Sequence, residues 1–180
     1  MYSNIMYSNI MCGISNNTLE DKLKHQLNIQ NFDDLSKTQW KQISQYHYLT
    51  EEFIEKYQHK MEWYFLCFFQ KLSENIMEKY IDELSWISIS AFQILSEHFI
   101  EKYKNDINWY SISENQNLSE TFIEKYQDKL NWGKISLAQN LSNAFIIKHK
   151  DKIDFQRLLY NEKTIITNDF KLILKLLGVM

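Results

Sequence analysis

The stretch LSETFIEKYQDKLNWGKIS, residues 118–136, recurs with small changes along most of this chain of 180 residues. Its tryptophan, Trp132, is the last of five that follow one another at intervals of 23 residues, and Phe155 stands in the sixth place. A fixed period of this kind is typical of repeat proteins, in which each short unit buries its apolar side only against its neighbours. The sequence therefore predicts a repeat architecture over residues 40–154.

Each copy of the repeat predicts two short helices. The first begins at a serine or threonine such as Ser119, whose hydroxyl can accept a hydrogen bond from a free amide of the first turn. Leu118 and Ile123 stand where a hydrophobic staple is expected around that cap. The second helix begins near the tryptophan, and helices this short are not stable without neighbours. Its candidate N-caps are Ser85, Asn108, Asn131 and Asp154, with Gln39 and Glu62 as weaker ones.

We therefore expect a single all-α domain, an α-solenoid of about five helix pairs. The absence of proline and the presence of only three glycines favour helices over a turn-rich β fold. Capping units are expected at residues 18–39, where Thr18 can begin a helix, and at residues 155–180, where Thr167 can begin another that ends before Gly178. Residues 1–17, which contain a duplicated MYSNI, are expected to form a flexible tail.

One other fold has a compatible period, the leucine-rich repeat, with units of about 20–29 residues. Its strand would need apolar residues both three and five places after each tryptophan. The fifth place holds Gln45 in one copy and Glu114 in another, and both would face a core without partners. The helical solenoid is the favoured interpretation.

The composition bears on location and partners. The net charge of −3 gives no general attraction to nucleic acid or to an anionic membrane, so nucleic-acid binding is disfavoured. The two cysteines, Cys12 and Cys67, form no CxxC pair, which indicates a reduced intracellular setting. The first residues lack the basic and apolar regions of a signal peptide, and no apolar run has the length of about 18 residues that a membrane span requires.

Motifs for catalysis, cofactors and metals are absent from the sequence. The five histidines form no HxxxH pair and no cluster with cysteine. There is no glycine-rich phosphate loop, nucleophile elbow or HExxH motif. We therefore expect a non-enzymatic protein without a cofactor or metal.

Three columns of residues recur in nearly every copy, and each has a structural interpretation. The tryptophans are expected to lie in the core, because aromatic side chains dominate core packing. The glutamines seven places later are expected to cap carbonyls at the end of the second helix or to bond the next copy, because a buried amide needs partners. The lysines sixteen places after each tryptophan follow glutamates, which predicts a solvated face of mixed charge.

The departures from the repeat are the candidate binding residues. Tyr64, Phe65, Phe68 and Phe69 stand at places where other copies hold Lys41, Gln42, Glu114, Asn115 and Lys134, so these places are expected to face solvent. This aromatic cluster is either covered by the N-terminal segment or exposed as a patch that binds a partner. The last helix, with Phe170, Leu174 and Leu177, is apolar on more than one face, so it is either buried on both sides or meets a partner.

The unit LSExFIEKYxDKLNWxxISxxQ resembles a short helical repeat of mimivirus-like giant viruses, over roughly residues 35–160. The resemblance implies a viral or A+T-rich source and brings no known activity. We expect a protein-interaction scaffold with an unidentified host or viral protein as its partner, in the host cytoplasm or in the virion. The alternative is a structural or virion-assembly subunit that self-associates as a homo-oligomer through its last helix.

Overall fold

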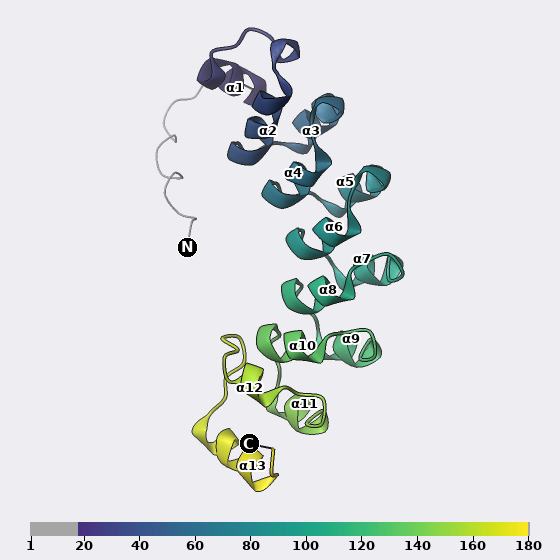
Figure 1. Ribbon diagram of the computed structural model, residues 1–180, viewed down its shortest axis with the longest axis vertical. Helices are drawn as coiled ribbons and strands as arrows, with labels where there is room; N and C mark the ends of the chain where they lie inside the picture. Colours follow the sequence, from purple (N-terminus) through teal and green to yellow (C-terminus); the bar gives the residue numbers. More distant parts are fainter. Residues whose placement is uncertain (1–17, 180) are drawn as a thin grey trace.

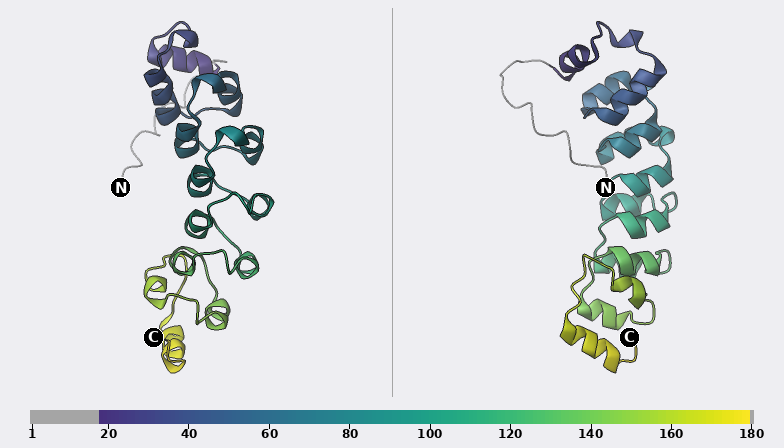
Figure 2. Two further views of the ribbon diagram at one scale, coloured as in Figure 1. Left: turned by 45° about the vertical axis from the view of Figure 1, so that its right-hand side comes forward. Right: turned by 60° about the vertical axis from the view of Figure 1, so that its left-hand side comes forward.

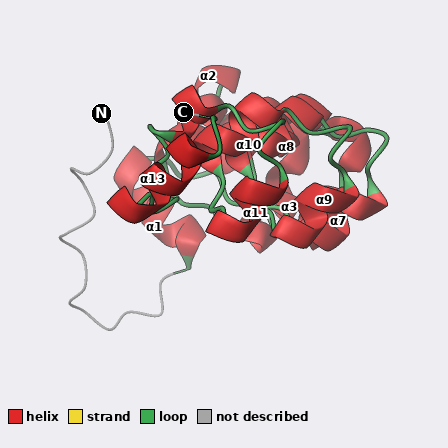
Figure 3. Cartoon of the chain, turned by 90° about the horizontal axis from the view of Figure 1, so that it is seen from below, coloured by secondary structure: helices red, strands yellow, loops and turns green. Residues whose placement is uncertain are grey.

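The computed structural model describes residues 18–179, and all regular structure in this range is helical. The helices alternate between two rows that run the length of the molecule and bend together into an arc (Figure 1). Figure 3, seen from one end, shows the two rows side by side. The predicted all-α solenoid is confirmed. The leucine-rich alternative is wrong for the described residues, because it needs a strand in every copy.

The inner row lies on the concave side of the arc and the outer row on the convex side. Each inner helix packs against the inner helices before and after it. Figure 2 shows from two further sides that successive helix pairs stack one on another. The inner row consists of α2 (Lys37–Tyr46), α4 (Trp63–Phe69), α6 (Trp86–Phe92), α8 (Trp109–Asn115), α10 (Trp132–Ala138) and α12 (Phe155–Leu158). The outer row consists of α3 (Glu51–Tyr57), α5 (Glu74–Lys79), α7 (Glu97–Lys102), α9 (Glu120–Lys125) and α11 (Asn143–Lys148).

The outer helices begin where the sequence predicts. In α9 the hydroxyl of Ser119 accepts a hydrogen bond from the amide of Phe122 at 3.1 Å. Thr50, Ser73, Ser96 and Ser142 make the equivalent bond in the other outer helices. The helices of this row span only six or seven residues, and two of them continue into a 3₁₀ turn, η2 (Gln58–Lys60) and η3 (Ile81–Glu83).

The inner helices begin less uniformly. Asn108, Asn131 and Asp154 cap α8, α10 and α12 as predicted, whereas Ser85 makes no side-chain cap bond, so that part of the prediction is wrong. Helix α2 also begins three residues before its tryptophan, because Ser36 caps it in a capping box. One helix therefore crosses the expected boundary between the N-terminal cap and the first copy.

The core lies between the two rows and is continuous along them. Ile43, Leu66, Ile89, Ile112 and Ile135, three places after each tryptophan, are fully buried. The tryptophans fit the prediction only in part: Trp40 and Trp63 are buried, but Trp86, Trp109 and Trp132 are half-buried. The N-terminal cap explains the burial of Trp40, because the ring of Phe32 lies 5.8 Å from it. Trp109 instead keeps an edge at the surface, where its Nε1 donates to the carbonyl of Lys104.

A row of buried glutamines, the glutamine ladder (Gln70, Gln93, Gln116 and Gln139), ties each copy to the one before it. Gln116 Nε2 donates to the carbonyls of Ser90 and Gln93 at 3.1 and 2.8 Å, and its Oε1 accepts from the amide of Leu95 at 2.9 Å. The other three glutamines make the same three bonds one copy earlier or later. These bonds satisfy the carbonyls that the end of each inner helix leaves free, which confirms the predicted structural role.

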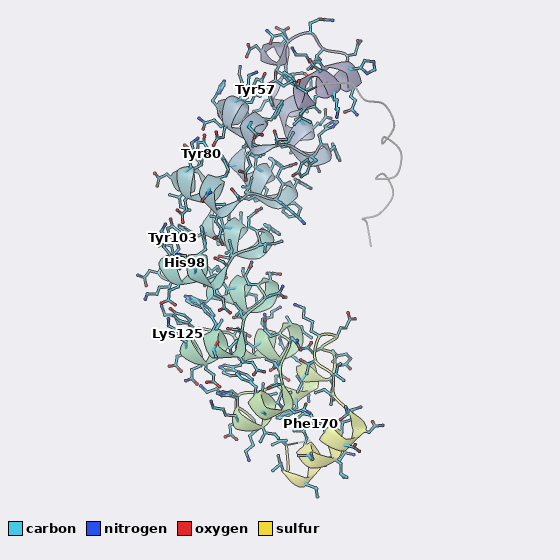
Figure 4. All side chains as sticks on the ribbon, turned by 180° about the vertical axis from the view of Figure 1, so that it is seen from behind. Tyr57, Tyr80, His98, Tyr103, Lys125 and Phe170 are labelled. Carbon is cyan, nitrogen blue, oxygen red and sulfur yellow. The ribbon has the colours of Figure 1, made fainter. Side chains whose placement is uncertain are left out.

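The outer row is joined by charged side chains. Lys125 Nζ lies 2.6 Å from a carboxylate oxygen of Glu101 in the preceding copy, and it also lies over the ring of Tyr126. Equivalent ion pairs join Lys56 to Glu20, Lys79 to Glu55, Lys102 to Glu78 and Lys148 to Glu124. Figure 4 labels Tyr57, Tyr80, Tyr103 and Lys125 along this outer edge. The mixed-charge face that the sequence predicts is therefore a ladder of pairs between copies.

Both ends are closed by capping elements. At the N-terminal end, α1 (Leu19–Leu27) begins at Thr18 with a capping box, and η1 (Phe32–Asp34) follows it. At the C-terminal end the repeat is shortened: Asn161 Nδ2 donates to the carbonyls of Ser136 and Gln139 in place of the next glutamine. Thr164 replaces the Oε1 atom of the glutamine, because its hydroxyl accepts the hydrogen bond from the amide of Leu141. The last helix, α13 (Asn168–Leu176), begins at Thr167 as predicted and is followed by Gly178 with a positive φ of 68°.

Candidate protein-interaction surface

Helix α4, which lies in the concave row, carries four aromatic side chains that are at least partly exposed. Tyr64, Phe68 and Phe69 are 58%, 45% and 38% exposed, and Phe65 is half-buried. The rings of Phe65 and Phe69 are stacked with centroids 6.3 Å apart, and Phe68 lies 4.6 Å from Phe69. Phe68 also reaches α6, where its ring centroid is 4.4 Å from that of Phe92. We call these five residues, Tyr64, Phe65, Phe68, Phe69 and Phe92, the aromatic patch.

Helical geometry places the patch on the solvent side of α4. Leu66, Cys67 and Gln70 are buried, so residues 64, 65, 68 and 69 must point away from the core. The equivalent places in α8 and α10 include Asn115, which is exposed, and Lys134, which is half-buried. The fold therefore forms with polar residues at these places, and the aromatic residues are not required by the repeat itself.

The sequence left two alternatives for this cluster, burial under the N-terminal segment or exposure. That segment, residues 1–17, lies outside the described residues. Among residues 18–179, the contact above the patch is Lys41, whose Nζ lies 4.4 Å from the centroid of the Phe65 ring. Tyr64, Phe68 and Phe69 remain exposed beside this contact.

Sequence reasoning missed one member of the patch, Phe92, and one flanking residue, Tyr46. Both stand six places after a tryptophan, as Phe69 does, and they are 45% and 71% exposed. The signal was available, because this place is aromatic in the first three copies and Asn115 or Ala138 in the next two. Tyr46, Phe69 and Phe92 thus form a row of three aromatic residues, one in each of the first three copies.

The predicted binding residues of the last helix need a correction. Phe170 and Leu174 are 2% and 0% exposed, because they form the face of α13 that packs on the core (Figure 4). A partner cannot reach them while the helix is packed. Leu177, just after the helix, is exposed as predicted. The apolar residues that α13 presents to solvent are Leu172, Ile173 and Leu176.

Titratable side chains have structural partners rather than a shared cavity. The hydrogen bond from Lys125 lowers the pKa of the Glu101 carboxyl, and Lys148 followed by His149 does the same for Glu124. Burial raises the pKa of the Cys67 thiol to about 12, so this cysteine is not a reactive thiolate. Within residues 18–179 there is no group of three or more His, Cys, Asp or Glu side chains placed to hold a metal ion.

A shallow depression on the outer row, with a volume of about 420 Å³, lies between neighbouring copies. His98 and Glu101 contribute to it, but Glu101 is already paired with Lys125. Figure 4 labels His98 and Lys125 on this convex edge, on the side opposite to the inner row. The depression is thus a gap between residues of the outer ion pairs, and the aromatic patch is the stronger candidate site.

The fold and the patch together define the class of this protein as an α-solenoid repeat protein with an exposed aromatic surface on its concave side. Comparison with protein-family models, with curated proteins and with solved structures found no match to the chain. The resemblance to giant-virus repeats therefore stays a prediction. No helix in the described range is long and apolar enough to cross a membrane.

Proposed function

We propose that this chain is a non-enzymatic protein-interaction scaffold that binds a partner protein through the aromatic patch. The observation that supports the proposal is the exposure of contacting aromatic rings on two neighbouring inner helices. Clustered exposed apolar side chains mark interaction sites, and aromatic residues supply much of the binding energy at protein interfaces. The concave surface of a solenoid is the surface that such proteins commonly use for binding.

The test compares two double variants with the wild-type chain in affinity capture followed by mass spectrometry. Phe65→Ser with Phe69→Ser removes two rings of the patch, and Leu172→Ser with Leu176→Ser removes exposed apolar residues at a distant place. We expect a partner that the wild type and the α13 variant retain and that the patch variant loses. Far-UV circular dichroism must show the same helix content for all three proteins. Capture of the same proteins by the patch variant would refute the proposal.

A second candidate function is self-association through α13. Its outer face exposes Leu172, Ile173 and Leu176, whereas terminal caps of solenoids usually present a polar face. Light scattering or sedimentation at increasing concentration tests this candidate. A homo-oligomer that the Leu172→Ser and Leu176→Ser variant loses would favour a structural subunit, and a concentration-independent monomer would exclude it.

The source and location of the partner are part of the same proposal. The resemblance to repeats of mimivirus-like giant viruses supports a host or viral partner, in the cytoplasm of an infected cell or in the virion. Capture from infected cells and from purified virions, with the same pair of variants, distinguishes these two settings.

A further inference from the structure

The charged side chains within the helices α2, α4 and α6 have one sign. Within their bounds, the three inner helices α2, α4 and α6 contain no aspartate or glutamate and two lysines. One of these, Lys37, is paired with Glu62 at 2.9 Å. The other, Lys41, lies over Phe65, and Lys71 follows two residues after Phe69; both are exposed. Among residues 18–179, neither Lys41 nor Lys71 lies within ion-pair distance of a carboxylate.

The rest of the inner row is different. In α8, Glu114 pairs with Lys134 of α10, and in α12 Arg157 pairs with Asp154 at 3.1 Å. The outer row likewise uses its lysines in the ladder with glutamates. Two exposed lysines without a carboxylate partner in the described part of the chain therefore accompany the aromatic patch in the first copies of the repeat: Lys41, which lies over a patch ring, and Lys71, which follows Phe69 by two residues.

We infer that the patch accepts an acidic peptide segment, with aromatic or branched aliphatic anchors on the rings and carboxylates near Lys41 and Lys71. This inference rests on the proposed function and adds the chemistry of the partner. Apolar anchors supply affinity by leaving water, while charges of opposite sign at the rim favour one class of partner over others. A segment rich in lysine or arginine would meet like charges at both lysines.

Single-stranded nucleic acid also combines negative charge with flat rings, but the structure favours a peptide. A nucleic-acid groove needs a basic track that follows the phosphate backbone beyond the stacking platform. Beyond α6 on the inner row, Lys134 and Arg157 are already paired with carboxylates. The patch rings also contact one another, since Phe68 touches both Phe69 and Phe92, which leaves little space between them for a base.

The test is selection of a random peptide library on the full-length chain, with counter-selection on the Phe65→Ser and Phe69→Ser variant. We expect peptides that bind in a patch-dependent way, carry net negative charge and contain aromatic or aliphatic anchors. Patch-dependent peptides without acidic enrichment would overturn the inference and leave the proposed function standing. A selection that yields no patch-dependent peptide would overturn both.

Two further probes test the other possible occupants of the patch, a nucleic acid and the N-terminal segment of this chain. A fluorescent oligothymidylate that binds the patch in a strongly salt-dependent way would overturn the inference in favour of nucleic acid. A synthetic peptide with the uncharged sequence of residues 1–17 would overturn it in favour of an intramolecular occupant, if it binds the patch more tightly than the acidic peptides.

Charge reversal tests the role of the two lysines. With a selected acidic peptide, Lys41→Glu with Lys71→Glu should weaken binding about tenfold, which corresponds to about 1.4 kcal/mol. The control is Lys22→Glu with Lys175→Glu, which changes the net charge of the protein by the same amount. These two exposed lysines lie on the capping helices α1 and α13. We expect the control to bind within about twofold of the wild type. Equal weakening by both variants would show that overall charge, and not these two lysines, attracts the peptide, and would refute the assignment.

Discussion

Replacing Gln116 by methionine tests the glutamine ladder most directly. Gln116 is 2% exposed and makes three hydrogen bonds to the preceding copy. Methionine has a similar length and shape but cannot make these bonds. The substitution therefore removes the polar contacts of one junction with little change in packed volume.

The magnitude follows from the groups left without partners. Two carbonyls, of Ser90 and Gln93, and the amide of Leu95 would remain buried at the junction. Each unsatisfied buried group costs about 1–3 kcal/mol, so the gross loss for three groups is about 3–9 kcal/mol. Transfer of a more apolar side chain into the core offsets about 1–2 kcal/mol of this loss. The net decrease in the free energy of unfolding should therefore be about 1–8 kcal/mol.

Urea denaturation followed by far-UV circular dichroism measures this decrease. In a repeat protein each copy contacts only its neighbours, so weakening one junction can also separate the transition into two steps. Such a separation would appear as a lower apparent m-value. The matched control is Gln127→Met, because Gln127 makes one exposed bond, from Lys152. We expect that control to stay within about 0.5 kcal/mol of the wild type. A Gln116→Met variant as stable as the control would refute the structural role of the ladder.

Three further predictions concern the core, the outer ladder and the cysteine. Trp40→Ala should lower the free energy of unfolding by about 3–5 kcal/mol, whereas replacing the half-buried Trp86 by alanine should lower it by only about 1.5–3 kcal/mol. Denaturant titration measures both losses. Equal losses would contradict the difference in burial between the two tryptophans. The lowered pKa of Glu101 means that its ion pair stabilises the fold above the unfolded value of about 4.5 and is lost as the pH falls below it. The melting temperatures of wild type and Glu101→Gln should therefore converge between about pH 7 and pH 3, and a gap that stays constant would refute the reasoning. In a Cys12→Ser variant, the buried Cys67 should react with a thiol reagent only after unfolding, and rapid reaction of the native protein would contradict its raised pKa of about 12.

The candidate site could be predicted from the sequence in part. Tyr64, Phe65, Phe68 and Phe69 stand out because no other copy has four aromatic residues at these places, and the structure leaves them at least partly exposed. Phe92 joins them only through the stacking of α4 on α6, 24 residues after Phe68 in the chain. The apolar pattern of the last helix did not show which of its faces is buried. Phe170 and Leu174 face inward only because α13 docks with that side on the preceding copy.

The sequence by itself determined the period, the all-α class, the starts of the outer helices and the structural role of the repeated glutamines. These features depend on local interactions, such as a cap three residues from the amide that it satisfies, and on the spacing of apolar residues along one helix. Only the tertiary structure decided the partial exposure of the later tryptophans, the replacement of the last glutamine by Asn161 and Thr164, and the place of α4 and α6, which carry the aromatic patch, in the concave row. Each of these depends on the rotation and offset between neighbouring copies. Contacts across 21 to 26 residues set that geometry, and the pattern within a single copy does not contain it.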